Sequence, residues 1–191
     1  MKSSQETFVN TKRKQTVTFS TINICGIKNK KQDLIDEMKR RKIKILGISD
    51  TRIKDRGCKK LYQNYTFLYS GVDPVLRATH GVGFIVDPTF AKNIVQVTHQ
   101  NERSMSVTIT IDHVNTTFIQ AYAPCNTLNN ENEREDFFKD VNKLISNSNN
   151  EDDQYILEDF NAHLGTNREG IEEYKGPLAI QGTRLTTTVI N

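Results

Sequence analysis

The sequence has 191 residues, of which 26 are Lys or Arg and 23 are Asp or Glu, for a formal charge of +3. Leu, Ile, Val and Phe together supply 50 residues, about a quarter of the chain. Chains that remain disordered typically have less than roughly 20% of these residues, so we expect one folded domain. No apolar run approaches the ~20 residues that span a bilayer, and the polar first 15 residues lack the apolar stretch of a secretory signal, so we expect neither membrane insertion nor secretion.

The first third of the chain predicts a strand, a helix and a second strand. Residues 1–15 are polar and basic, which predicts a disordered arm. The β-branched run 17–24 predicts the first strand, apolar residues at helical spacing predict a helix over 30–41, and the apolar run 43–49 predicts a buried strand. Such a unit calls for two parallel strands joined by a right-handed crossover.

The rest of the chain predicts mainly short strands. Turn residues separate five strand candidates, which favours antiparallel meanders over further crossovers: 65–70, 81–86, 93–97, 105–111 and 116–122. A helix is predicted over 131–145 and a final short strand over 155–157, while periodicity fades beyond residue 166. We therefore expect an α+β domain over 16–170, in which helices cover mixed sheets, with 171–191 as its tail.

Charge is divided unevenly along the chain. Residues 1–60 carry 17 basic and 6 acidic side chains, whereas residues 61–191 carry 9 basic and 17 acidic ones. This asymmetry favours a polyanionic partner on one side and an acidic, metal-binding centre elsewhere. Solvated helix faces whose charges happen to segregate are the alternative interpretation.

The cysteines indicate a reducing environment. Cys25, Cys58 and Cys125 are scattered and form no CxxC pair. Neither a disulfide scaffold nor a structural zinc site is therefore predicted, and we expect an intracellular protein of the nucleus or cytoplasm.

Polar side chains stand at the ends of four predicted strands. Asn23 interrupts the first strand, Asp50 follows the second, Tyr122 ends the strand over 116–122, and Asp159 follows the last. Each has a purely structural explanation when taken alone, such as a bulge for Asn23 or an Asx turn for Asp159. Ligands bind at the carboxyl ends of strands in sheets built with crossovers, so the four together predict a site.

Seven segments carry a resemblance to a known family. They occur in the family's order and together span roughly residues 17–185: TINICG (21–26), KILGISDTR (44–52), YSG (69–71), HGVGFIVD (80–87), ERSMSVTI (102–109), AYAP (121–124) and ILEDFNAHLG (156–165). The sequence resembles the endonuclease/exonuclease/phosphatase superfamily, and more closely the apurinic-type endonuclease domains of non-LTR retrotransposons and the craniofacial development protein 2-like proteins. The resemblance implies a DNase I-like, four-layer α/β/β/α sandwich.

The resemblance also implies roles for individual residues. Asn23 and Asp50 match the family's metal-binding residues, and Tyr122, Asp159 and Asn161 match its catalytic ones. Mg²⁺, with Mn²⁺ as an alternative, is the implied cofactor, and one acid and one amide suit an ion that keeps several waters.

Two arginines are candidates for binding substrate. Arg52 follows the metal-binding acid and Arg103 belongs to the segment over 102–109, so both are expected to contact phosphate. DNA is the implied partner, no membrane is involved, and the oligomeric state is left open.

The sequence departs from the family pattern in three places. Asp50 stands where the family usually has Glu, which shortens the reach of the carboxylate by roughly 1.5 Å. Glu158 stands where Gly is common, which predicts a charged side chain beside the phosphate path. Only TTTVIN follows Leu185, before the family's closing Asp and His segments, so we expect a second sheet that is incomplete at the C-terminus and a reduced activity.

Three functions are compatible with these residues. The first is a Mg²⁺-dependent endonuclease of retroelement type that hydrolyses phosphodiester bonds in DNA. The second is a non-catalytic, nucleic-acid-binding remnant, and the third is a phosphatase on the same fold, because a fold does not determine its substrate.

Overall fold

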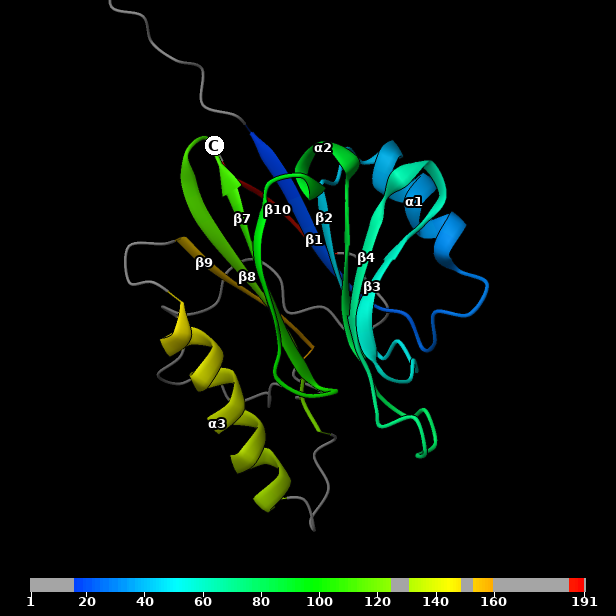
Figure 1. The fold of residues 1–191 in the computed structure, drawn as a ribbon, viewed down its shortest axis with the longest axis vertical. Coiled ribbons are helices and arrows are strands. Elements are labelled where there is room, and N and C mark those ends of the chain that lie inside the picture. The colour runs from blue at the N-terminus through cyan, green and yellow to red at the C-terminus, as the bar shows by residue number, and fades with distance from the viewer. Residues whose placement is uncertain (1–15, 125–130, 149–152, 160–185, 191) are drawn as a thin grey trace, which may run out of the picture.

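Two β-sheets face each other in the computed structural model (Figure 1). The larger sheet has the strand order β10-β1-β2-β5-β4-β3, and the smaller has the order β6-β7-β8-β9. The arm predicted over 1–15 and most of the tail predicted over 171–191 lie outside the described residues. The structure describes residues 16–124, 131–148, 153–159 and 186–190.

The strands and helices have these bounds. The larger sheet contains β1 (Val17–Asn23), β2 (Ile45–Ser49), β3 (Arg56–Lys60), β4 (Thr66–Ser70), β5 (Val82–Val86) and β10 (Thr186–Ile190). The smaller sheet contains β6 (Ile94–His99), β7 (Ser104–Ile111), β8 (Val114–Tyr122) and β9 (Asp153–Asp159). The helices are α1 (Lys31–Arg40), α2 (Pro88–Ala91) and α3 (Glu131–Asn147), with a short 3-10 turn η1 (Tyr62–Asn64).

The strand pairing confirms the predicted connections and adds one. β1 and β2 are parallel and joined through α1, and β3-β4-β5 and β6-β7-β8 are antiparallel meanders. β8 and β9 form a second parallel pair joined through α3, so each sheet contains one crossover.

Besides the short turn η1, three elements were missed by the sequence pattern. β3 has the sequence RGCKK and lies at a sheet edge with mostly exposed side chains, so it has no apolar alternation to detect. In α2, Pro88 occupies the first turn and the Asp87 carboxylate accepts a hydrogen bond from the Thr89 N–H at 2.9 Å. β10 pairs antiparallel with β1 in the region where periodicity fades.

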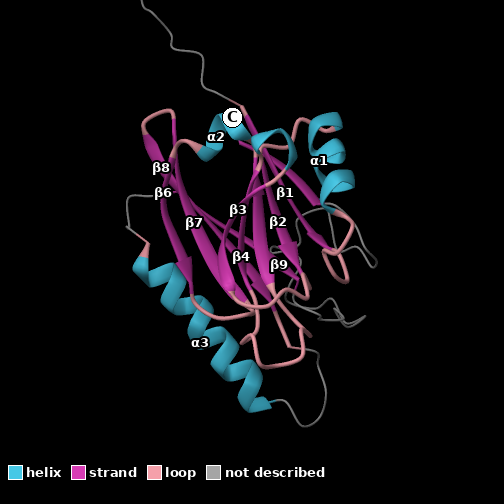
Figure 2. Ribbon diagram, turned by 45° about the vertical axis from the view of Figure 1, so that its right-hand side comes forward, coloured by secondary structure: helices cyan, strands magenta, loops and turns pink. Residues whose placement is uncertain are grey.

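Four layers follow from how the apolar faces are buried. Inward-facing residues of both sheets form one core, which includes Phe19, Phe84 and Phe118. Leu34, Ile35 and Met38 of α1 cover the outer face of the larger sheet. Phe137 and Val141 of α3 pack on the outer face of the smaller sheet at Ala121. Figure 2 shows α1 and α3 on opposite sides of the two sheets, which is the predicted α/β/β/α order.

No helix in the described part of the chain has both the length and the apolar content needed to cross a lipid bilayer.

Candidate active site

The ends of β1, β8 and β9 meet at one end of the space between the sheets. Thr21 on β1 donates a hydrogen bond to Gln120 on β8, with 3.2 Å between the side-chain oxygens. Inward-facing positions recur every second residue of a strand, so the next ones along are Asn23 and Tyr122. The register between β8 and β9 sets Asp159 directly beside Tyr122. Three predicted site residues therefore share one end of the molecule.

Asp50 joins this end through the turn that follows β2. Its backbone has a left-handed conformation, with φ of 51°, and its carbonyl accepts a hydrogen bond from the Gly26 N–H at 2.7 Å. The next residue, Thr51, donates its backbone N–H to the carbonyl of Gly81 at 2.9 Å. Backbone hydrogen bonds on both sides thus hold Asp50 beside the end of β1, although its position in the sequence is remote.

The Asp50 carboxylate is buried and paired. Only 5% of the residue is exposed, and Arg52 donates to both carboxylate oxygens, from Nε at 3.2 Å and from a terminal nitrogen at 3.1 Å. The hydrogen bond to Asp50, followed by its charge, raises the pKa of Arg52 above its usual range. In the free protein, the positive charge of Arg52 therefore already neutralises Asp50, the acid predicted to bind metal.

Asn23 holds a tight turn at the end of β1. Its side-chain oxygen accepts a hydrogen bond from the Cys25 N–H at 3.1 Å, and the Cys25 Sγ lies 3.5 Å from the same oxygen. Cys25 has a left-handed backbone, with φ of 47°, so the chain turns sharply away from the sheet. The amide oxygen is thereby fixed on the inward side of the strand end.

Arg103 holds the tyrosine of the site in place. Its guanidinium carbon lies 5.6 Å from the centre of the Tyr122 ring, and one terminal nitrogen donates to the Tyr122 carbonyl at 3.4 Å. The other terminal nitrogen donates to Glu133 of α3 at 2.9 Å. These contacts support a positioning role for Arg103, and its predicted contact with phosphate stays a prediction.

His80 also lies beside Tyr122 and Arg103, although the sequence analysis assigned it no role. Its ring centre lies 6.4 Å from that of Tyr122, and its Nε2 accepts from Arg103 at 3.3 Å, which leaves the proton on Nδ1. Burial first, and then the charge of Arg103, lower the pKa of His80, so the ring is neutral near pH 7. The segment HGVGF was visible in the sequence, but nothing in it showed that His80 faces Tyr122.

The structure describes the last two predicted catalytic residues only in part. The backbone of Asp159 ends β9, whereas Asn161 lies outside the described residues. The expectation for Glu158 is wrong, because Tyr155 and Leu157 face the core between the sheets and alternation turns Glu158 to the outer face. There, burial raises its pKa to about 7.

The donor set at this end suits a hard cation. Asn23 and Asp50 offer an amide oxygen and a carboxylate, which are the ligands that Mg²⁺ prefers when it keeps most of its waters. Among the side chains that the structure describes, no three His, Cys, Asp or Glu residues gather into a metal cluster. A site held by few protein ligands is what such a set predicts.

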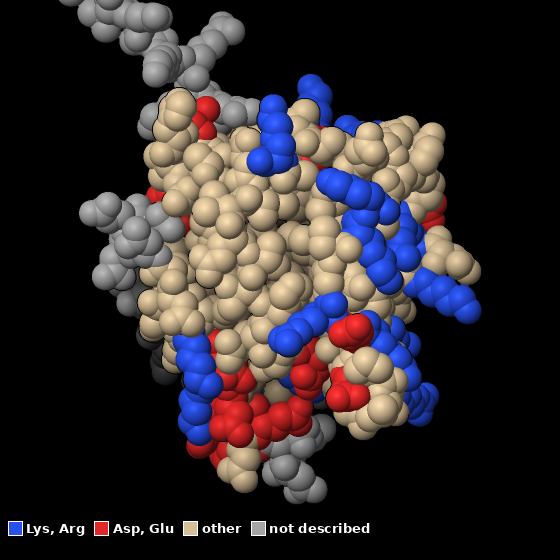
Figure 3. Space-filling model, in the orientation of Figure 1, with Lys and Arg blue, Asp and Glu red and all other residues tan. Residues whose placement is uncertain are grey.

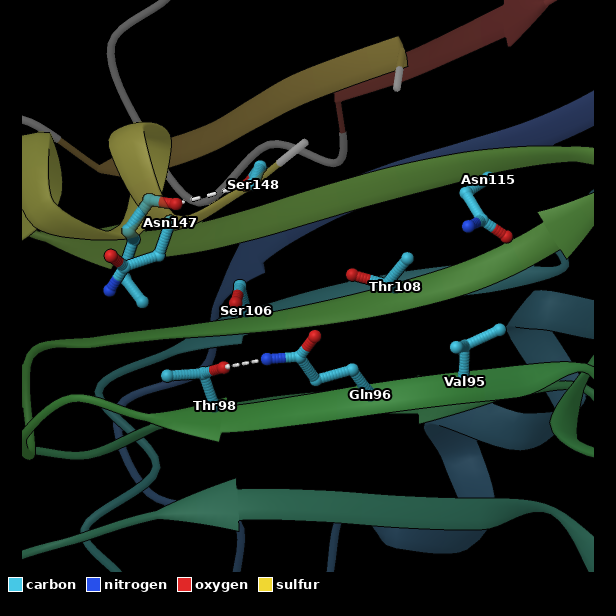
Figure 4. Close-up of a pocket in the computed structure, with 9 residues that line it drawn as sticks. Val95, Gln96, Thr98, Ser106, Thr108, Asn115, Asn147 and Ser148 are labelled. Carbon is cyan, nitrogen blue, oxygen red and sulfur yellow. Dashed lines mark hydrogen bonds between the residues drawn. The ribbon is translucent and has the colours of Figure 1, made fainter. Parts of the chain in front are cut away.

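A shallow hollow on the outer face of the smaller sheet is chemically different (Figure 4). Side chains of β6, β7 and β8 line it together with Asn147 and Ser148 at the end of α3. None of the lining residues is ionisable. It lacks the groups for acid–base or metal chemistry, so it does not compete with the strand ends as a candidate active site.

Charge on the surface is segregated in the fold as it is in the sequence. Figure 3 shows Lys and Arg along the side formed by β3 and β4, and Asp and Glu over the first turns of α3. The first turn of α3 contributes Glu131 and Glu133, whereas Arg56, Lys59 and Lys60 of β3 are exposed. A polyanion would therefore meet attraction on the side of β3.

Comparison with known proteins places the fold. No family model and no curated protein matches the sequence. An AP endonuclease from Leishmania major superposes with a TM-score of 0.58 at 12% identity, over 75% of this chain and 55% of that one. The endonuclease domain of TRAS1, a telomere-specific non-LTR retrotransposon, gives 0.56 at 14% identity, over 77% and 60%. TDP2 from D. rerio, complexed with a single-strand DNA product, gives 0.57 at 11% identity, over 78% and 62%.

The shared feature is the fold. At these identities the chain shows the DNase I-like fold of the endonuclease/exonuclease/phosphatase superfamily, as the sequence predicted. It spans between 55% and 62% of the length of the three proteins compared.

Proposed function

We propose that this chain hydrolyses phosphodiester bonds in DNA with the help of Mg²⁺. The observation that supports this most directly is the gathering of Asn23, Asp50, Tyr122 and the backbone of Asp159 at one end of a fold shared with nucleases. Residues that lie far apart in the sequence provide, at one place, oxygen ligands for a cation and a phenol for a phosphate.

Asn23 and Asp50 would hold the ion. When bound, Mg²⁺ polarises a phosphate oxygen and neutralises the charge that develops in the transition state. Arg52 pairs with Asp50 in the free protein, and 52% of its side chain is exposed, so it is able to turn from the carboxylate to a substrate phosphate. Arg52 would then balance the charge of Asp50 in the free protein and the charge of the phosphate when substrate is bound.

Tyr122 and Asp159, at strand ends of the smaller sheet, carry the proposed chemistry together with Asn161, which lies outside the described residues. Asp159 orients or deprotonates the attacking water, and Asn161 donates to the oxygens of the reacting phosphate. Tyr122 donates to the phosphate or to the leaving oxygen, with its ring held by Arg103. These roles rest on the resemblance and on the position of Tyr122 and Asp159 at adjacent strand ends.

Contact with DNA beyond the reacting phosphate would come from basic side chains. The segment KNKK (28–31) leads into α1 just after the end of β1, and the Lys30 ammonium donates to the carbonyl of Ile24. This segment lies next to Asn23 and suits the phosphates that flank the scissile bond. Binding through such charges weakens as salt rises.

Nicking of supercoiled and abasic-site DNA tests the proposal. We expect nicking with Mg²⁺ that EDTA abolishes and that Asp159→Ala removes, whereas Asp33→Ala, an exposed acid in the first turn of α1, retains it. Salt-sensitive DNA binding without nicking would instead support a non-catalytic binding protein. Release of phosphate from small esters, with intact DNA, would support a phosphatase.

A further inference from the structure

We infer that Gln120 is a positioning residue of the proposed active site. Its side chain sets the distance between the half of the site on the larger sheet and the half on the smaller sheet. Asn23 and Asp50 belong to the larger sheet, and Tyr122 and Asp159 belong to the smaller one. The consequence for metal affinity rests on the proposed function, but the positioning itself is a property of the free protein.

Side chains alone determine the distance between the two sheets. Within each sheet, backbone hydrogen bonds fix the register, as for Asn23 beside Ser49 and for Tyr122 beside Asp159. Facing sheets share no such ladder and are held ~10 Å apart by the side chains between them. The layer of side chains next to the site therefore decides where its two halves lie.

The interior is built in layers that run toward the site. Further from it, Phe19, Phe118 and Tyr155 pack together, with ring centres 4.9 to 5.7 Å apart. This layer is aromatic, with the Tyr155 hydroxyl as its one polar group, and it holds the sheets together through ring packing. The next layer along the strands contains Thr21 and Gln120, and it is polar.

Gln120 reaches across the space between the sheets. Its side chain is fully buried, and its Oε1 accepts the hydrogen bond from the Thr21 hydroxyl at 3.2 Å. A Cβ atom on Gly47 of β2 would lie 1.9 Å from the same Oε1, so the glycine makes the room that the amide occupies. Gln120 thus contacts two strands of the opposite sheet, β1 and β2, which carry Asn23 and lead to Asp50.

Packing alone does not account for an amide at this place. Among the described residues, the Nε2 of Gln120 and the Oγ of Ser49 are both buried without a hydrogen-bond partner. An unpaired buried polar group destabilises a protein, so an apolar side chain of similar volume would serve a core better. The directional bond to Thr21, two residues before Asn23, is what the amide adds.

Two substitutions remove this bond with little change in shape. Thr21→Val removes the donor and Gln120→Leu removes the acceptor, and Thr21→Ser keeps the hydroxyl as the conservative rescue. Thr108→Val is the matched control, because it breaks a hydroxyl pair with Thr117 at 2.9 Å within the smaller sheet, away from the site.

The first readout is the side-chain amide signal of Asn23 in a ¹H–¹⁵N spectrum, assigned by its loss in Asn23→Asp. The second is the affinity for Mn²⁺, measured by electron paramagnetic resonance. In Thr21→Val and Gln120→Leu we expect the Asn23 signal to move and Mn²⁺ to bind roughly tenfold more weakly, as when the support of a metal ligand is lost. Thr21→Ser and Thr108→Val retain the wild-type signal and affinity.

The outcomes separate the inference from the proposed function. An Asn23 signal at its wild-type position in both Thr21→Val and Gln120→Leu, or one displaced equally in Thr108→Val, overturns the inference. A wild-type protein that neither binds Mn²⁺ nor nicks DNA overturns the proposed function instead, and the amide signal then still decides whether Gln120 positions Asn23.

Discussion

The two ends of the space between the sheets differ in chemistry. Away from the site, Phe19, Phe118 and Tyr155 pack in an aromatic layer whose one polar atom is the Tyr155 hydroxyl. At the site end, the interior layer formed by Thr21 and Gln120 is polar, and the turns that follow β1 and β2 hold Asn23 and Asp50. The aromatic end stabilises the fold through ring packing. At the site end, polar contacts fix the positions of particular side chains instead.

The polar atoms that lack partners follow the same division. Among the described side chains, buried polar atoms without a hydrogen bond occur at Ser49, Thr51, His80, His99 and Gln120. The register of β6, β7 and β8 sets His99 level with Gln120, so all five lie toward the site end. Native interiors rarely tolerate such atoms, and strained backbone and unsatisfied groups concentrate at functional sites. The comparison predicts that substitutions at one end change mainly stability and at the other mainly activity.

The largest effect is expected at the aromatic end. Phe118→Ala should lower the free energy of unfolding by about 3–5 kcal/mol, because a fully buried ring with two aromatic neighbours leaves a cavity. The midpoint of urea unfolding measures it. Phe138→Ala, on a ring that is 43% exposed, is the control and should cost far less. Equal losses would show that the aromatic layer is not what holds the sheets.

The second effect should appear in activity. Asp50→Asn should reduce DNA nicking by roughly 10²–10³-fold, because it removes the carboxylate proposed to hold the ion, while the urea midpoint changes little. Arg52→Gln is the matched variant. It leaves Asp50 unpaired, so we expect Mn²⁺ to bind more tightly while the KM for DNA rises. Asp50→Asn with wild-type nicking would contradict the assignment.

A third effect is a pH dependence at Glu158. Its pKa is raised from 4.5 to about 7 by burial, so its contribution to stability is complete below pH 4.5 and is lost as pH rises through about 7. Glu158→Gln should therefore gain about 1–2 kcal/mol at pH 8, allowing for partial exposure, and gain nothing near pH 4. Urea unfolding at the two pH values checks this, and an equal gain at both would exclude titration of Glu158 as the cause.

The smallest effect concerns His80 and has the opposite sign. Burial and Arg103 lower its pKa below 6.5, so stability is complete above pH 6.5 and is lost as pH falls below that value. His80→Gln should flatten this loss, measured in the Glu158→Gln background between pH 7.5 and 5.5. His99 also has a pKa lowered by burial, so His99→Gln should flatten the remainder. If stability still falls with pH to the same extent after both substitutions, other titratable groups cause the loss.

Local patterns were sufficient for most of the secondary structure. The predicted helix over 30–41 is α1 and that over 131–145 is α3, because each has an apolar stripe that packs on a sheet. β3 was missed because an edge strand with a charged, exposed face has no burial pattern to reveal it. Glu158 was assigned to the wrong side because the match to a family motif says nothing about which face of a strand a residue occupies.

By itself, the sequence pattern determined an α+β domain of mixed sheets and which polar residues end its strands, since periodicity and turn residues are local properties, and the resemblance implied the sandwich. Only the tertiary structure decided that Arg52 neutralises Asp50 and that Arg103 and His80 surround Tyr122. The same holds for Gln120, whose amide crosses the space between the sheets to Thr21. The physical reason is that the direction of the Arg52 side chain depends on the left-handed turn at Asp50, and Arg103, His80 and Tyr122 meet only when distant segments pack together. The contact of Gln120 with Thr21 also crosses between the sheets, whose spacing depends on all the side chains packed between them.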